Sequence, residues 1–175
     1  MRPDNEIVKI RKEEPGNIPA IRRLNELAFD HPVEAKIVDQ LRAANAVILS
    51  MVATIGKEVV GHILFSTVTV ESNAGTFKAV ALAPMAVLPG RQKTGAGSML
   101  VRAGLDELRR SGHEVVFVLG HPEYYPQMGF ERASLHGLKW EFEAPDEAFM
   151  VIELRPGALH GRGGVVKYRP EFSAV

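Results

Sequence analysis

Three segments rich in β-branched and aliphatic residues lie in the middle of the chain, and they constrain its fold more than any other feature. They cover Val47 to Ile55, Val59 to Val70 and Phe77 to Val87. Short polar turns join them, Gly56-Lys57-Glu58 and Ser72-Asn73-Ala74-Gly75. Runs of this composition favour strands, and turns this short join antiparallel neighbours. The sequence therefore predicts an antiparallel three-stranded meander.

After the meander the pattern changes to a helix followed by one more strand. The apolar residues of Gly95 to Arg110 share one helical face: Leu100, Val101, Gly104, Leu105 and Leu108. Ser111-Gly112 ends this helix, and Val115 to Leu119 is continuously apolar, as in a buried central strand. A strand, a helix and a strand in succession form a right-handed crossover between parallel neighbours. These features predict the α/β fold class, with a mixed sheet in which a parallel β-α-β unit follows the antiparallel meander.

Shorter elements are expected around this sheet. The patterns predict a strand over 7–12, helices over 18–28 and 37–44, a short helix over 123–128, and strands over 138–142 and 149–154. A length of 175 residues fits one domain, which we place at residues 1–155. The Gly-rich tail over 156–175 is expected to pack on that domain or on a partner subunit, as in a homodimer.

The composition argues against several classes of protein. The chain has 21 Lys and Arg and 21 Asp and Glu, so it lacks the basic excess of a nucleic-acid-binding protein. It has no cysteine, and therefore no disulfide and no thiolate nucleophile. The start has no apolar signal core, and the apolar stretch Ala79 to Pro89 is too short to span a bilayer. We expect a cytoplasmic protein with no nucleic-acid partner and no membrane partner.

A glycine-containing turn between a predicted strand and a predicted helix is a candidate phosphate site. It reads Gln92-Lys93-Thr94-Gly95-Ala96-Gly97-Ser98. Glycines let the backbone approach a ligand closely, and the first helical turn offers free N–H donors and the positive end of the helix dipole. The alternative is a tight strand-to-helix turn without a ligand. The residues after Gly95 fit neither a Walker loop nor the dinucleotide fingerprint.

The spacing Gln92-x-x-Gly95-x-Gly97 after an apolar strand resembles the GNAT superfamily of N-acetyltransferases. The resemblance implies the acyl-CoA N-acyltransferase fold of that family and acetyl-CoA as co-substrate. It implies that the pantetheine arm lies along Met85, Ala86 and Val87. It also implies that the pyrophosphate is surrounded by Gln92, Lys93, Thr94, Gly95, Ala96, Gly97 and Ser98.

A second segment, Gly120-His121-Pro122-Glu123-Tyr124-Tyr125-Pro126, leads into Gly129-Phe130 and is similar to one branch of GNAT proteins. In the family, a tyrosine four residues before the Gly-Phe pair protonates the leaving thiolate, which implies Tyr125 as the acid. Tyr124 is the alternative, and either tyrosine can instead pack with its hydroxyl in water. The resemblance also implies that the N–H of Met85 or Ala86 polarises the thioester carbonyl. We expect a local break in the strand at Pro84, because proline has no N–H for the ladder.

The general base is less clear, because the strand over 81–87 carries no carboxylate. His121 and Glu123 are the candidates, and imidazole exchanges protons most readily near neutral pH. A histidine that only orders the loop is the alternative for His121. His31 and Glu34 lie where the family binds acceptors, although an exposed carboxylate at a helix start is the default for Glu34. No cluster has metal-ligand spacing, so no metal is predicted.

These inferences predict an acetyl-CoA-dependent N-acetyltransferase that acts by direct attack of a primary amine in a ternary complex. The acceptor is expected to be a small-molecule amine or a protein amine. The alternative is a non-catalytic acyl-CoA-binding sensor or assembly module on the same fold. The missing strand carboxylate favours this alternative, and Tyr125 argues against it, because a pure binder needs no leaving-group acid.

Overall fold

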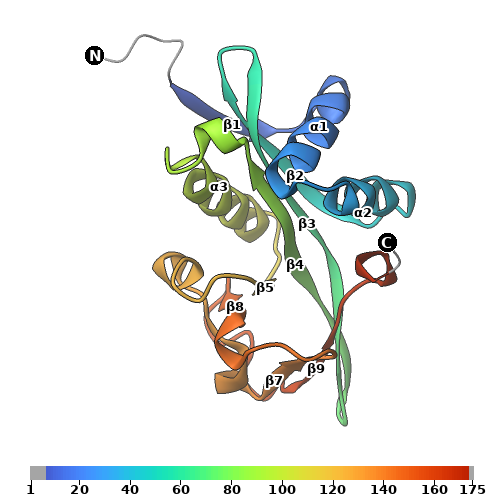
Figure 1. Ribbon diagram of the computed structural model, residues 1–175. Coiled ribbons are helices and arrows are strands. Elements are labelled where there is room, and N and C mark those ends of the chain that lie inside the picture. The colour runs from blue at the N-terminus through green and yellow to red at the C-terminus, as the bar shows by residue number, and fades with distance from the viewer. Residues whose placement is uncertain (1–6, 174–175) are drawn as a thin grey trace.

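A mixed sheet of nine strands forms the centre of the molecule, and helices cover both of its faces (Figure 1). The computed structural model describes residues 7–173. The strands are β1 (Val8–Lys12), β2 (Val47–Ile55), β3 (Glu58–Ser72), β4 (Gly75–Val87), β5 (Val115–Leu119), β6 (Glu131–Arg132), β7 (Leu138–Trp140), β8 (Phe149–Glu153) and β9 (Gly164–Lys167). The α-helices are α1 (Ile18–Phe29), α2 (Val33–Ala43) and α3 (Ala96–Arg110). Short 3-10 turns include η4 (Tyr125–Met128) and η7 (Pro170–Phe172).

The order of the strands confirms the predicted mixed sheet. It runs β1-β2-β3-β4-β5-β8-β6, with β9 paired to β3 and to β7. The strands β2, β3 and β4 are antiparallel neighbours, as the short turns between them require. The pair β4–β5 is parallel, as the intervening helix α3 predicts. The first two helices begin and end close to their expected positions, although α2 starts at Val33, a full turn earlier than its apolar stripe indicated.

The two faces of the sheet bury different helices. Figure 1 shows α3 on one face and the pair α1 and α2 on the other. On the α3 face, Leu100 and Leu105 pack with Phe65 in the main core. A Cβ at Gly104 would clash with the ring of Phe65, which explains a glycine in the apolar stripe of α3. On the other face, Leu41 of α2 packs with Leu64 of β3.

A β-bulge interrupts β4 at the point where proline was expected to break it. The register with β3 shifts between Ile63↔Met85 and Phe65↔Leu82, so β4 carries one residue more than its partner there. The extra residue falls at Ala83–Pro84, whose peptide bond is cis. The expectation of a local break at Pro84 is therefore confirmed.

The end of the chain joins the sheet before it reaches α2. The strand β9 pairs antiparallel with the far end of β3, at Thr69–Glu71, and parallel with β7. The sequence did not indicate β9, since the strand is short and the glycines at its start weaken the strand pattern. After β9 the chain crosses to η7, which lies against α2 and brings Phe172 into the cluster around Leu41 (Figure 1).

A histidine is fully buried beneath α1. His62 on β3 has an exposed fraction of 0%, and its ring nitrogens lie 2.9 Å from Ser50 Oγ and 3.3 Å from Asn25 Nδ2. Burial disfavours the charged ring and lowers the pKa of His62 from 6.5 to about 3. His62 is therefore a neutral, hydrogen-bonded strand residue. None of the helices within residues 7–173 has both the length and the apolar character needed to cross a membrane.

Candidate functional site

A cavity of about 750 Å³ opens where β4 and β5 separate. The two strands pair only at Val80↔Val116 and Ala81↔Phe117, and beyond these residues each continues without the other. The cavity reaches from the start of α3 through this gap to the helices on the other face. Its lining comprises Phe29, Glu34, Ile37, Leu82, Ala83, Pro84, Met85, Val87, Arg91, Gln92, Lys93, Gly95, Ala96, Gly97, Ser98, Val118, Leu119, Gly120, His121, Tyr124, Tyr125 and Phe172.

The turn before α3 presents backbone N–H groups at one end of the cavity. Gly95 is the N-cap of α3 and has a φ of 89°, a left-handed conformation that glycine adopts without strain. No side chain caps the helix, so the N–H groups of its first turn are available to a ligand. Gln92 Nε2 donates to Val87 O at 3.3 Å and ties the turn to the end of β4. These features make an anion site at the start of a 15-residue helix.

The backbone of β4 directs one N–H into the gap beside β5. Leu88 N donates to Val60 O at 2.9 Å, and hydrogen-bonded pairs alternate along an antiparallel ladder. His62↔Ala86 is therefore the next hydrogen-bonded pair, and Ile63↔Met85 is not one. The N–H of Ala86 is used by the ladder, whereas that of Met85 points toward the separated strand β5. Of these two candidate donors, Met85 is the one available to a ligand.

Tyr124 connects the segment after β5 to the first turn of α3. Its hydroxyl lies 3.0 Å from Ser98 Oγ. A Cβ at Gly97 would lie 3.1 Å from the same hydroxyl, so a glycine at this position gives the tyrosine room. The two motifs that sequence reasoning treated separately therefore meet at one wall of the cavity.

Tyr125 reaches the cavity from a buried position. The residue is 7% exposed, and its ring makes edge contacts with Tyr124 and Phe130 at centroid distances of 5.0 and 5.6 Å. Burial, and secondarily Tyr124, raises the pKa of the Tyr125 phenol above its ordinary value. The phenol therefore stays protonated at neutral pH, as a proton donor must. A Cβ at Gly120 would lie 2.5 Å from the Tyr125 ring, so this ring position requires glycine there.

The structure brings together most of the site residues expected from the sequence. Those that line the cavity are Met85, Val87, Gln92, Lys93, Gly95, Ala96, Gly97, Ser98, His121 and Tyr125. Three lie outside the lining: Ala86, Thr94 and Glu123. Ala86 is buried in the ladder, and Thr94 Oγ1 bonds Arg91 O at 2.6 Å. His121 is exposed and also lines the cavity.

The lining residues that sequence reasoning missed include Phe29, Ile37 and Phe172, at the end away from α3, and Gly120, directly after β5. The Asp30-His31-Pro32 break between two amphipathic helices was a usable signal for Phe29 and Ile37. Phe172 had no local signal, because it arrives through the strand β9. Gly120 could have been noticed only with the tyrosine ring in place.

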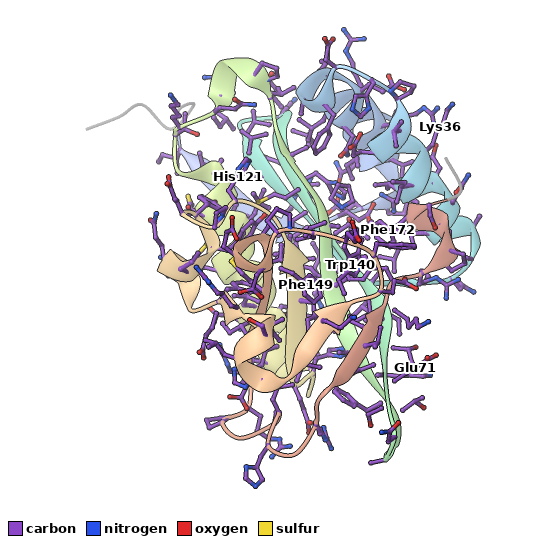
Figure 2. The ribbon with its side chains drawn as sticks, turned by 60° about the horizontal axis from the view of Figure 1, so that its bottom comes forward. Lys36, Glu71, His121, Trp140, Phe149 and Phe172 are labelled. Atoms are coloured by element: carbon purple, nitrogen blue, oxygen red, sulfur yellow. The ribbon has the colours of Figure 1, made fainter. Side chains whose placement is uncertain are left out.

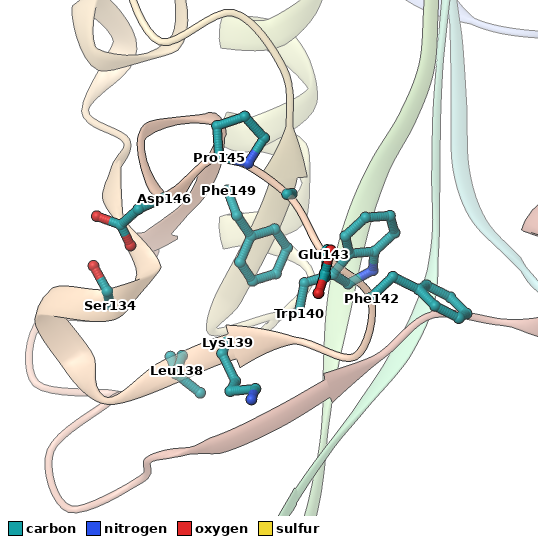
Figure 3. A pocket seen from close by; sticks show the side chains of 10 residues that line it. Ser134, Leu138, Lys139, Trp140, Phe142, Glu143, Pro145, Asp146 and Phe149 are labelled. Atoms are coloured by element: carbon teal, nitrogen blue, oxygen red, sulfur yellow. The ribbon is translucent and has the colours of Figure 1, made fainter.

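A second cavity, of about 610 Å³, lies against β7 and the loop that follows it (Figure 3). Trp140, Phe142 and Phe149 form its apolar part. It shares no lining residue with the first cavity, and its Asp146 is paired with Arg132 at 3.3 Å. Within residues 7–173, no group of three or more His, Asp or Glu side chains is placed to hold a metal ion.

Comparison with known proteins assigns the same region a family. The family model described as an acetyltransferase (GNAT) domain matches residues 9–133. The uncharacterized N-acetyltransferase YhbS of Escherichia coli strain K12 is 36% identical over 165 residues, which cover 94% of this chain and 98% of YhbS. A crystal structure of E. coli YhbS in complex with CoA matches with a TM-score of 0.89 at 35% identity, covering 95% of this chain and 92% of that one. A GNAT family acetyltransferase from Brucella melitensis, in complex with acetyl-CoA, matches with a TM-score of 0.78 at 34% identity, covering 95% and 98%.

Proposed function

This chain belongs to the GNAT family of acetyltransferases, and we propose that it transfers the acetyl group of acetyl-CoA to a primary amine. One observation carries the proposal. A single cavity contains an anion site at the start of α3, a free backbone N–H at Met85 and the buried phenol of Tyr125. Acetyl transfer from a thioester needs these three groups, and a pure anion site needs only the first.

In this proposal the pyrophosphate of acetyl-CoA lies against the first turn of α3. The N–H groups of Gly95 to Ser98 and the helix dipole hold it, and Lys93 adds positive charge at the rim. The pantetheine arm runs along Met85 and Val87 into the gap between β4 and β5. The two similar structures, one in complex with CoA and one with acetyl-CoA, support acetyl-CoA as the co-substrate.

The chemical step is a direct attack in a ternary complex. The amine nitrogen forms a bond to the thioester carbon, and the N–H of Met85 stabilises the oxyanion that develops there. The C–S bond then breaks as the carbonyl reforms, and the nitrogen releases its surplus proton to solvent. Tyr125 gives its phenolic proton to the leaving thiolate, so the products are an amide and CoA with a free thiol. A proton from solvent restores the tyrosine.

The amine must lose a proton before it attacks, and His121 is our proposed acceptor of that proton. His121 lines the mouth of the cavity, whereas Glu123 lies outside its lining. The strand β4 offers no carboxylate between Ala81 and Val87. His121 is exposed, so transfer through a water molecule is the route that its position favours.

The lack of a carboxylate on β4 also supports a second candidate function, a non-catalytic acyl-CoA-binding module. Such a module would keep the anion site and would release no thiol. Release of free thiol from acetyl-CoA, measured over a panel of primary amines, separates the two. Amine-dependent release that needs Tyr125 is expected for the transferase, whereas binding of acetyl-CoA without release under any amine would favour the module.

A further inference from the structure

The end of the cavity away from α3 is apolar except for one carboxylate, whereas the end at α3 carries the proposed anion site. It is built by α1, α2 and η7, on the opposite face of the sheet from α3. Its side chains are Phe29, Glu34, Ile37 and Phe172. Three of these are apolar and one is a carboxylate. This end is where an acceptor meets the thioester in the proposed reaction.

Glu34 is the one carboxylate in the described lining of the cavity. Its side chain is 23% exposed, and its Oε2 atom is buried. The partner of Oε2 is His31, whose Nδ1 lies 3.0 Å away and is charged only when the ring is protonated. An ammonium group carries a permanent charge at neutral pH and gives a carboxylate a charge-assisted hydrogen bond. Glu34 is therefore placed to pair with an ammonium group that enters the cavity.

The apolar residue Phe172 at this end packs against further aromatic rings. The Phe172 ring packs edge-on against Tyr168 at 5.4 Å, and Tyr168 packs against Trp140 at 5.9 Å. Trp140 in turn stacks on Phe149 at 6.3 Å, so the tail is anchored to the sheet through aromatic rings (Figure 2). An apolar surface favours binding of an acceptor with an apolar body. It disfavours an acceptor with a second charge, because that charge would be desolvated without a partner.

The charges of the cavity are also separated. Its arginine and lysine, Arg91 and Lys93, both belong to the turn before α3. In the described lining, the end near Glu34 has no Lys or Arg to pair with an anionic acceptor. A carboxylate carried by the acceptor would therefore face Glu34 unpaired, which is unfavourable in a partly buried site.

We propose that the acceptor is a primary amine with one ammonium group on an apolar, otherwise uncharged body, and that the partly buried carboxylate of Glu34 binds this ammonium. The inference rests on the proposed acetyl transfer, because it names the acceptor of that reaction. It excludes amino acids, whose carboxylate meets Glu34, and polyamines, whose second ammonium meets the apolar wall.

Two matched pairs of amines test the acceptor class. Phenylethylamine is compared with phenylalanine, which adds a carboxylate, and butylamine with 1,4-diaminobutane, which adds an ammonium. We expect kcat/KM to be at least about tenfold higher for the first member of each pair. A preference for phenylalanine or for the diamine would overturn the inference and leave acetyl transfer intact.

A substitution tests the role of Glu34. Glu34→Gln is expected to raise the KM for the amine by about tenfold or more, while the KM for acetyl-CoA and the Tm stay the same. Glu26→Gln, on the surface of α1 in a pair with Arg22, is the control and should change neither KM. An unchanged amine KM in Glu34→Gln would count against the assignment.

Binding measured without turnover keeps the two proposals separable. Calorimetric titration of phenylethylamine into the complex with CoA should give heat that Glu34→Gln removes. If this binding is present but no amine is acetylated, the acetyl transfer fails and the amine site stands. If the wild-type complex with CoA binds neither phenylethylamine nor butylamine, the assignment of the amine site is wrong.

Discussion

The hydroxyl of Tyr124 lies 3.0 Å from Ser98 Oγ, which ties the segment after β5 to the first turn of α3. These residues are 26 positions apart in the chain and belong to the two motifs that carry the proposed chemistry. The bond lies between the proposed pyrophosphate site and the proposed acid. It gives a structural reason for two adjacent tyrosines with different tasks.

Tyr124→Phe should weaken binding of acetyl-CoA without slowing chemistry. Without the bond, Ser98 is fixed only when ligand binds, at a cost of about 0.5–1.5 kcal/mol, so the Kd should rise about two- to tenfold while kcat stays within about twofold. Ser98→Ala should have a similar effect. In the double variant the losses should not add, because both substitutions remove the same bond. Calorimetry on the four proteins checks this, and fully additive losses would argue against the bond.

Tyr125→Phe should have the opposite effect: it should slow the chemical step and leave the affinity for acetyl-CoA unchanged. Removal of a general acid typically costs about 10²–10⁴-fold in rate, and the phenol has no proposed contact with the phosphates. We expect kcat to fall within that range while the Kd for acetyl-CoA changes by less than about twofold. Single-turnover thiol release and calorimetry measure the two quantities. Wild-type turnover in this variant would remove Tyr125 as the acid.

Gly120→Ala should also lower kcat, because it displaces the ring of Tyr125. The added methyl would lie 2.5 Å from the Tyr125 ring, so the ring must shift. Overpacking of this kind costs about 1–3 kcal/mol of stability, and we expect kcat to fall with it. Gly16→Ala is the control, since a Cβ there meets no atom within 4 Å. Denaturant unfolding and turnover are the measurements, and an unaltered kcat would show that the ring position does not matter.

The free energy of unfolding should fall on mild acidification because of His62. Its pKa is lowered to about 3 by burial, whereas an unfolded histidine titrates near 6.5. Between these values the unfolded chain binds the proton and the folded chain does not. Stability is therefore lost as pH falls, at up to about 1.4 kcal/mol per pH unit. Glu13, whose pKa is also lowered, adds a loss only at lower pH.

Urea unfolding between pH 7 and pH 5 isolates the histidine contribution. His62→Gln should make the free energy of unfolding less dependent on pH, even though it also lowers that free energy at pH 7. His160→Gln, at an exposed position, should retain the wild-type slope. A wild-type protein with constant stability across this range would contradict a buried neutral His62.

The sheet was predictable from sequence because its signals are local. The short turns around Gly56 and Gly75 dictate antiparallel neighbours, and the helix before Val115 dictates a parallel one. Periodicity and turn length carry this information without knowledge of long-range contacts. The bulge at Pro84 was predictable for the same reason, since the missing N–H is a property of that residue alone.

The acceptor end of the cavity was only partly predictable, because it depends on long-range packing. Glu34 was noticed from its place between two helices, but its buried oxygen was not foreseen. Phe172 enters through β9, a short strand that follows a glycine-rich segment and that no periodicity marks. The choice of Met85 over Ala86 depends on which pairs of the β3–β4 ladder are hydrogen-bonded, and only the register reveals that.

Thermal unfolding with acetyl-CoA and with pantetheine tests the central claim most directly. Acetyl-CoA at 100 times its Kd should stabilise the protein by about 2.7 kcal/mol. For a chain of this size that corresponds to a rise in Tm of about 5–10 °C. Pantetheine lacks the pyrophosphate that the start of α3 is proposed to hold, so at the same concentration it should leave the Tm nearly unchanged. No rise in Tm at millimolar acetyl-CoA, or an equal rise with pantetheine, would contradict the proposed site.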